Sequence, residues 1–116
     1  MCMRRLVPLL FFAISCGGGE GPDPCEQGPT FANDITPVIE DHCIMCHDQG
    51  LQGPARRGAP MGVNFNSYET VEPYIAQFAD NITSGRMPPM NMAGTVPVTT
   101  PDRNLVDAWR RCGFPN

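Results

Sequence analysis

The segment HCIMCHDQG, residues 42–50, places two cysteines three positions apart and a histidine directly after the second. Residues i and i+3 of a helical turn face the same way, so the thiols of Cys43 and Cys46 would project to one side. Cys-x-x-Cys-His is the attachment signature of c-type haem, but the two thiols also suit half of a zinc site or a redox-active dithiol. Whether the motif binds haem, binds zinc or forms a redox-active dithiol determines which group, if any, the fold must accommodate.

The N-terminus indicates export. Two arginines precede an apolar run that is too short to span a bilayer as a helix, which is typical of a secretory signal peptide. The letters AISC, ending at Cys16, are similar to the lipobox of bacterial lipoproteins, and an ordinary cleaved signal is the alternative. We expect a lipoprotein signal peptide over residues 1–15, a lipid on Cys16, a flexible tether over residues 16–29 and a single domain over residues 30–116.

The expected location is the exported side of the cell. Gly17 follows Cys16 and is not the aspartate that retains such lipoproteins in the inner membrane of well-studied Gram-negative bacteria. We therefore expect a periplasm-facing or surface protein, held through its lipid at the outer membrane rather than the inner one. The chain has a formal net charge of −4 and no lysine, so it lacks the basic cluster that nucleic-acid binding needs. An acidic surface suits docking to a basic protein partner.

The six cysteines separate into groups. Cys2 leaves with the signal peptide and Cys16 takes the lipid. Outside the central motif this leaves Cys25 and Cys112. Because an exported chain meets an oxidising compartment, we expect these two to form a structural disulfide, with two separate free thiols as the alternative.

Haem fits the central motif better than its rivals. A zinc site needs four ligands, and besides the two cysteines the chain has only His42 and His47, with no second Cys-x-x-Cys pair. A thioredoxin-like dithiol follows a strand in a βαβ unit, whereas the residues before this motif are typical of a helix. The sequence therefore favours one covalent haem c on Cys43 and Cys46, with His47 as proximal iron ligand.

The opposite face of the iron needs a second ligand, and methionine is the natural candidate. Met87 follows a predicted helix, and the two prolines after it keep its loop extended. Met90 and then Met61 are the alternatives. His42 lies on the same segment as His47 and cannot reach the opposite face, so we expect it at the surface.

Capping residues predict several helices and no convincing pair of strands. Helices are expected to start at Thr36-Pro37, after Asn66 or Ser67, near Pro73 and at Thr100-Pro101. Apolar side chains are expected to pack around the haem: Phe31, Ile35, Ile39, Phe65, Ile75, Phe78 and Trp109. The expected fold class is mostly α, with a few helices and long loops.

These segments together resemble the small monohaem c-type cytochromes of the class I-like kind, in a bacterial lipoprotein form. The elements that carry the resemblance are FANDITPVIEDHCIMCH, NSYETV, ITSGRMPP and NLVDAWRRCGFP, within residues 31–115. The resemblance implies Cys43 and Cys46 as thioether sites, His47 as proximal ligand and Met87 as distal ligand.

The expected function is that of a single-electron carrier with His/Met axial ligation, a monomer that exchanges electrons with redox partner proteins and is not an enzyme. One alternative is a five-coordinate haem c sensor or haem-enzyme subunit, in which Met87 is not a stable ligand. A less favoured alternative is a non-haem Cys-x-x-Cys redox or zinc module.

Overall fold

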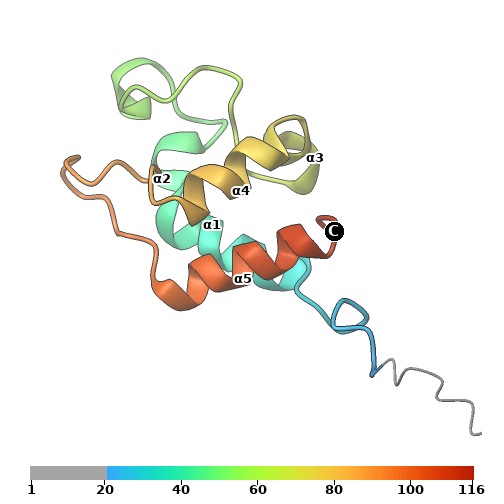
Figure 1. Ribbon diagram of the computed structural model, residues 1–116. Helices are drawn as coiled ribbons and strands as arrows, with labels where there is room; N and C mark the ends of the chain where they lie inside the picture. Colours follow the sequence, from blue (N-terminus) through green and yellow to red (C-terminus); the bar gives the residue numbers. More distant parts are fainter. Residues whose placement is uncertain (1–20) are drawn as a thin grey trace, which may run out of the picture.

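The computed structural model describes residues 21–116, and this part of the chain consists of helices and loops without a β-strand (Figure 1). The elements in chain order are η1 (Phe31–Ile35), α1 (Thr36–His42), α2 (Ile44–His47), η2 (Gly53–Arg56), α3 (Tyr68–Val71), η3 (Glu72–Tyr74), α4 (Ile75–Thr83) and α5 (Thr100–Arg111). The prediction of a mostly α fold is confirmed. The predicted signal peptide and Cys16 lie outside the described residues.

Helix α1 begins at Thr36 with Pro37 in its first turn, as predicted, but a π-helical turn, η1, precedes it, and Thr30 caps that turn. The Thr30 side chain accepts a hydrogen bond from the Asn33 N–H, and the Thr30 N–H donates to the Asp34 carboxylate at 2.9 Å. These reciprocal bonds satisfy N–H groups that a helix start leaves free. The π-helical η1 then continues into α1, and the Thr36 N–H donates to Phe31. Pro37 therefore lies inside a continuous helical segment.

The middle helices start and stop where the caps predict. Ser67 caps α3 through a capping box with Thr70. Pro73 lies in η3, which leads directly into α4. Gly85 has a φ of +77°, a conformation that glycine adopts without strain, and it ends this helical stretch. The loop that follows, shown in orange in Figure 1, connects α4 to α5.

Helix α5 packs against both α4 and η1 (Figure 1). It brings Trp109 into the helical core. The Trp109 side chain is fully buried, and its ring meets the ring of Phe78 edge-on. Its indole N–H donates to the Pro115 carbonyl at 2.8 Å. The same carbonyl accepts from the Phe31 N–H at 2.9 Å. The C-terminal residues thus close the core by joining α5 to η1. Among residues 21–116, no helix has the length and apolar character needed to cross a membrane.

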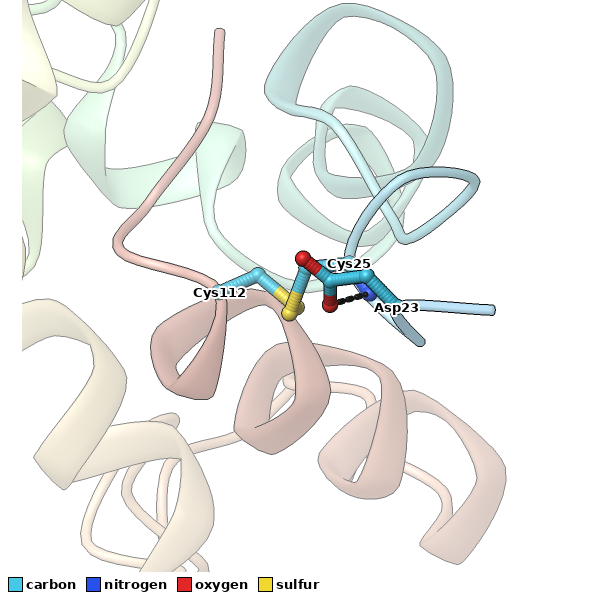
Figure 2. Close-up of a disulfide and its surroundings, with 3 residues drawn as sticks. All are labelled: Asp23, Cys25 and Cys112. Carbon is cyan, nitrogen blue, oxygen red and sulfur yellow. Dashed lines mark hydrogen bonds between the residues drawn. A yellow bond between two sulfur atoms is a disulfide. The ribbon is translucent and has the colours of Figure 1, made fainter. Parts of the chain in front are cut away.

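Cys25 and Cys112, the two cysteines predicted to pair, have their sulfur atoms 2.06 Å apart, which is a disulfide bond (Figure 2). The bond joins the segment before η1 to the residue that follows α5. Figure 2 also shows the Cys25 N–H donating to the Asp23 carboxylate, at 2.9 Å. The disulfide therefore attaches the N-terminal end of the domain to its last helix.

Replacing both cysteines, Cys25→Ser with Cys112→Ser, should lower the free energy of unfolding by about 4 kcal/mol, because the bond closes a loop of 87 residues in the unfolded chain. Urea denaturation followed by circular dichroism measures the change. Reducing agent should destabilise the wild type by a similar amount and leave the double variant unaffected. Equal stability of the two proteins would show that the bond does not restrict the unfolded chain.

Candidate functional site

A cavity of about 250 Å³ lies between α2, α4 and the loop after α4. Its volume is slightly below the range of about 300–1,000 Å³ that is typical of sites for cofactors and other small molecules. All four predicted haem-binding residues line this cavity: Cys43, Cys46, His47 and Met87. The structure therefore brings the central motif and the methionine of a distant loop to one place.

Most of the cavity wall is apolar. The apolar and aromatic residues that line it, apart from the four above, are Met45, Pro60, Val63, Phe65, Tyr74, Phe78, Ile82, Pro88 and Pro89. Of the seven side chains expected to surround a haem, only Phe65 and Phe78 line the cavity. The other five belong to the helical core or pack against it: those on η1, α1 and α5 are buried in the core, and Ile75 on α4 is partly buried against it. The expectation that all seven surround the cofactor is wrong for these five.

The two thiols of the motif come from the turn that joins α1 to α2. The Cys46 N–H donates to the Cys43 carbonyl at 3.1 Å, which keeps the two residues on one helical turn. Both thiols are free; Cys43 is buried and Cys46 is partly exposed. Burial, and to a lesser degree the neighbouring Cys46, raises the pKa of the Cys43 thiol to about 12. Because the thiolate is the nucleophile in disulfide exchange, this environment does not favour a redox-active dithiol.

His47 is held by hydrogen bonds on both its ring and its backbone. Its Nδ1 lies 2.8 Å from the Val63 carbonyl oxygen, and its own carbonyl accepts from the Phe65 N–H at 3.0 Å. The Phe65 ring stacks on the imidazole with centroids 4.3 Å apart. A carbonyl can only accept, so Nδ1 carries the proton and Nε2 of the neutral ring keeps a free lone pair. This is the arrangement that a metal-ligating histidine requires.

The local environment favours the neutral form of His47. Burial lowers the pKa of the ring below its usual value, and the hydrogen bond to Val63 opposes this effect. The positive charge of Arg56 lowers the pKa further. A neutral imidazole is the form that binds a metal ion, so the surroundings of His47 are compatible with a ligand role.

Met87 is the one of the three candidate methionines that lines the cavity. Its side chain is 40% exposed, and its N–H donates to the Asn81 carbonyl at 3.1 Å, which fixes the start of the loop against the end of α4. Met90 and Met61 are 84% and 67% exposed, and neither belongs to the cavity wall. Of the three, Met87 is thus the methionine that the structure places in the cavity wall, and its role as distal ligand stays a prediction.

His42 is buried, so the prediction that it lies at the surface is wrong. Only 4% of the residue is exposed, and its ring nitrogens contact the Val96 carbonyl at 2.8 Å and the Asp102 carboxylate at 3.1 Å. It also lines the cavity. Because both partners are distant in sequence, only the fold reveals the contact. His42 connects α1 to the loop of Met87 and to the first turn of α5.

Arg56 is a second buried polar residue, and nothing in its local sequence singles it out. It is 2% exposed, although it lies in the Gly/Pro-rich segment GPARRGAP, which is typical of an exposed loop. Its guanidinium donates at 2.8–3.3 Å to the backbone carbonyls of Asp48, Leu51, Ala59, Pro60 and Val63. The backbone of the loop between α2 and α3 is thus held together by hydrogen bonds to the Arg56 side chain.

The described part of the chain does not supply a conventional metal cluster. Among residues 21–116, no group of three or more His, Cys, Asp or Glu side chains could hold a metal ion together. Cys25 and Cys112 are bonded to each other and cannot serve as zinc ligands. An iron held by one imidazole and one thioether within a porphyrin needs no such cluster.

Comparison with known proteins identified no relative of this chain. No protein-family model matches the chain, and no curated protein and no solved structure matches it. The function therefore has to be inferred from the motif and from the cavity that its residues line.

The burial of Cys43 predicts unequal thiol reactivity in protein produced without haem attachment. At pH 8, iodoacetamide should alkylate Cys46 at least about tenfold faster than Cys43, because Cys43 is buried and its pKa is raised. Peptide mass spectrometry measures the two rates. In concentrated urea the rates should become similar, which serves as the control. Equal rates in the folded protein would contradict the burial of Cys43 in the cavity wall.

Proposed function

We propose that the protein is a single-electron carrier, a monohaem cytochrome c with a class I-like fold. In this proposal Cys43 and Cys46 form the thioether bonds to haem c, and His47 and Met87 are the axial ligands. The observation that carries it is that an intact Cys-x-x-Cys-His motif and a methionine from a separate loop line the same apolar cavity.

The residues present suit the cofactor in their chemistry. Both thiols of the motif are free to react with a porphyrin edge, and they lie on one helical turn. The Nε2 lone pair of His47 is free because Nδ1 donates to Val63. The rest of the wall is mainly apolar, which suits a flat aromatic macrocycle. The Met87 thioether completes a donor set of one nitrogen and one sulfur.

Bound haem would supply one-electron exchange between ferrous and ferric iron. The chain's own part is to fix the ligand ring of His47 through Val63, to present the Met87 sulfur and to limit the access of water with its apolar wall. A thioether ligand and an apolar surrounding both favour the reduced state, so the reduction potential should be relatively high for a haem protein. We assign no acid or base to a catalytic role, and the proposed activity is electron transfer alone.

The cellular setting belongs to the same proposal. The N-terminal sequence favours export and a lipid on Cys16, which would hold the domain at the outer membrane, facing the periplasm. The acidic composition favours redox partner proteins with basic docking surfaces. We propose that the domain acts as a monomer in this setting.

Covalent haem is the first test. Protein expressed with haem-attachment machinery should carry haem that survives denaturing gel electrophoresis, whereas Cys43→Ser combined with Cys46→Ser should not. Haem staining of the gel and the absorption spectrum provide the measurement. Fully matured wild-type protein without bound haem would rule out the proposed function.

Replacing the distal ligand should change the spin state of the haem. Met87→Ala should convert a low-spin absorption spectrum to a high-spin or mixed one, because the iron loses its thioether ligand. Met90→Ala and Met61→Ala are matched controls that remove a methionine outside the cavity wall, and they should leave the spectrum unchanged. A wild-type spectrum that is already high-spin would favour a five-coordinate sensor or haem-enzyme subunit. A spectrum unaffected by Met87→Ala would assign the distal position to another residue.

A further inference from the structure

The carbonyl oxygen of Val63 accepts hydrogen bonds from two side chains. The His47 imidazole donates through Nδ1 at 2.8 Å, and the Arg56 guanidinium donates through Nη2 at 3.0 Å. The first donor is the proposed proximal ligand, and the second is a permanent cation. The two groups are thus coupled through a single oxygen atom.

Within residues 21–116, the buried charge of Arg56 has no carboxylate partner. The residue is 2% exposed, and all five of its hydrogen bonds go to backbone carbonyls. The salt bridges of residues 21–116 involve other arginines and a histidine. Carbonyl dipoles stabilise the guanidinium but do not cancel its unit charge, so its field persists in a region that salt screens weakly.

Because His47 shares the Val63 oxygen with Arg56, the basicity of its imidazole as an iron ligand changes. A hydrogen bond from the far ring nitrogen to a carbonyl makes an imidazole more basic, and a more basic ligand stabilises ferric iron. A cationic donor on the same oxygen draws electron density from that oxygen and weakens the bond from Nδ1–H. The Arg56 charge also opposes the extra positive charge of the ferric state directly. Both effects favour the reduced state.

We propose that Arg56 is a positioning residue that raises the reduction potential of the bound haem by sharing the Val63 carbonyl with His47 and by its buried charge. This inference rests on the proposed function, because it requires His47 to be an iron ligand. It assigns to the loop between α2 and α3 a role in setting the potential as well as in shaping the cavity wall.

The test compares haem-loaded proteins. Arg56→Met removes the charge and the donors but keeps a long side chain, and it should weaken the affinity for an electron at least about tenfold, a fall of about 59 mV for a one-electron couple. Spectroelectrochemical titration measures the potential. Arg111→Met removes the same charge from an exposed position on α5 and should leave the potential nearly unchanged. Equal potentials in Arg56→Met and the wild type would overturn the proposal.

A second measurement separates this role from a merely structural one. In the reduced protein, nuclear magnetic resonance of the His47 Nδ1–H proton should show a downfield shift in Arg56→Met, because the hydrogen bond to Val63 strengthens when its competitor is lost. A general loosening of the loop would weaken that bond and move the proton upfield. An upfield or absent shift would therefore contradict the proposal even if the potential fell.

Arg56→Lys serves as the conservative variant, and as the test if Arg56→Met does not fold. Lysine keeps the charge but has three donors for five carbonyls. It should retain most of the wild-type potential, and a fall as large as tenfold in electron affinity would exclude charge as the cause. Haem staining of every sample separates the two proposals. Unloaded wild-type protein would contradict the proposed function, whereas loaded variants with an unchanged potential would contradict only the role of Arg56.

Discussion

The hydrogen bond from the His47 ring to the Val63 carbonyl determines which ring nitrogen can act as a ligand. The Phe65 N–H donates back to the His47 carbonyl, so the chain leaves the motif, loops around and returns to it within one segment. The loop in between is organised by backbone carbonyls that converge on Arg56 and not by a cluster of apolar side chains. One side of the cavity is therefore defined by hydrogen-bond geometry, which fixes direction more strictly than apolar packing does.

Hydrogen bonds between side chains and backbone carbonyls also hold the loop that carries Met87. His42, on α1, contacts the Val96 carbonyl. Arg57, in the loop between α2 and α3, donates to the Ala93 carbonyl at 2.6 Å. Both contacts join a side chain to the backbone of this loop, and of the two side chains only His42 lines the cavity. Met87 itself remains 40% exposed. The chain thus holds the half-buried imidazole of His47 by a hydrogen bond to its ring, whereas the side chain of Met87 lies at a partly open edge of the cavity.

The sequence predicted features that depend on neighbouring residues more reliably than those that depend on contacts made by the folded chain. The motif, the Ser67 cap and the placement of Met87 after a helix could be recognised because each depends on neighbouring residues. The start of α1 at Thr36 was predicted, but the π-helical turn η1 before it was missed. Pro37 has no backbone N–H and is typical of a first helical turn, so no local signal extended the helix toward Thr30. His42 and Arg56 were missed for a different reason. Burial of a polar side chain depends on its partners, and for His42 these lie 54 and 60 residues away.

Cys43, Phe78 and Ile82 belong both to the helical core and to the cavity wall, and Phe78 joins the aromatic rings of the two. Its ring is edge-on to Phe65 at 5.1 Å on the cavity side and edge-on to Trp109 at 6.2 Å on the core side. Trp109 is fully buried and does not line the cavity, and α5, which carries it, packs against α4 and η1. A change at Phe65 would act on the environment of His47, whereas a change at Trp109 would act on stability and reach the cavity through Phe78. This separation allows the loops around the cavity to determine the ligand chemistry while the helices maintain the fold.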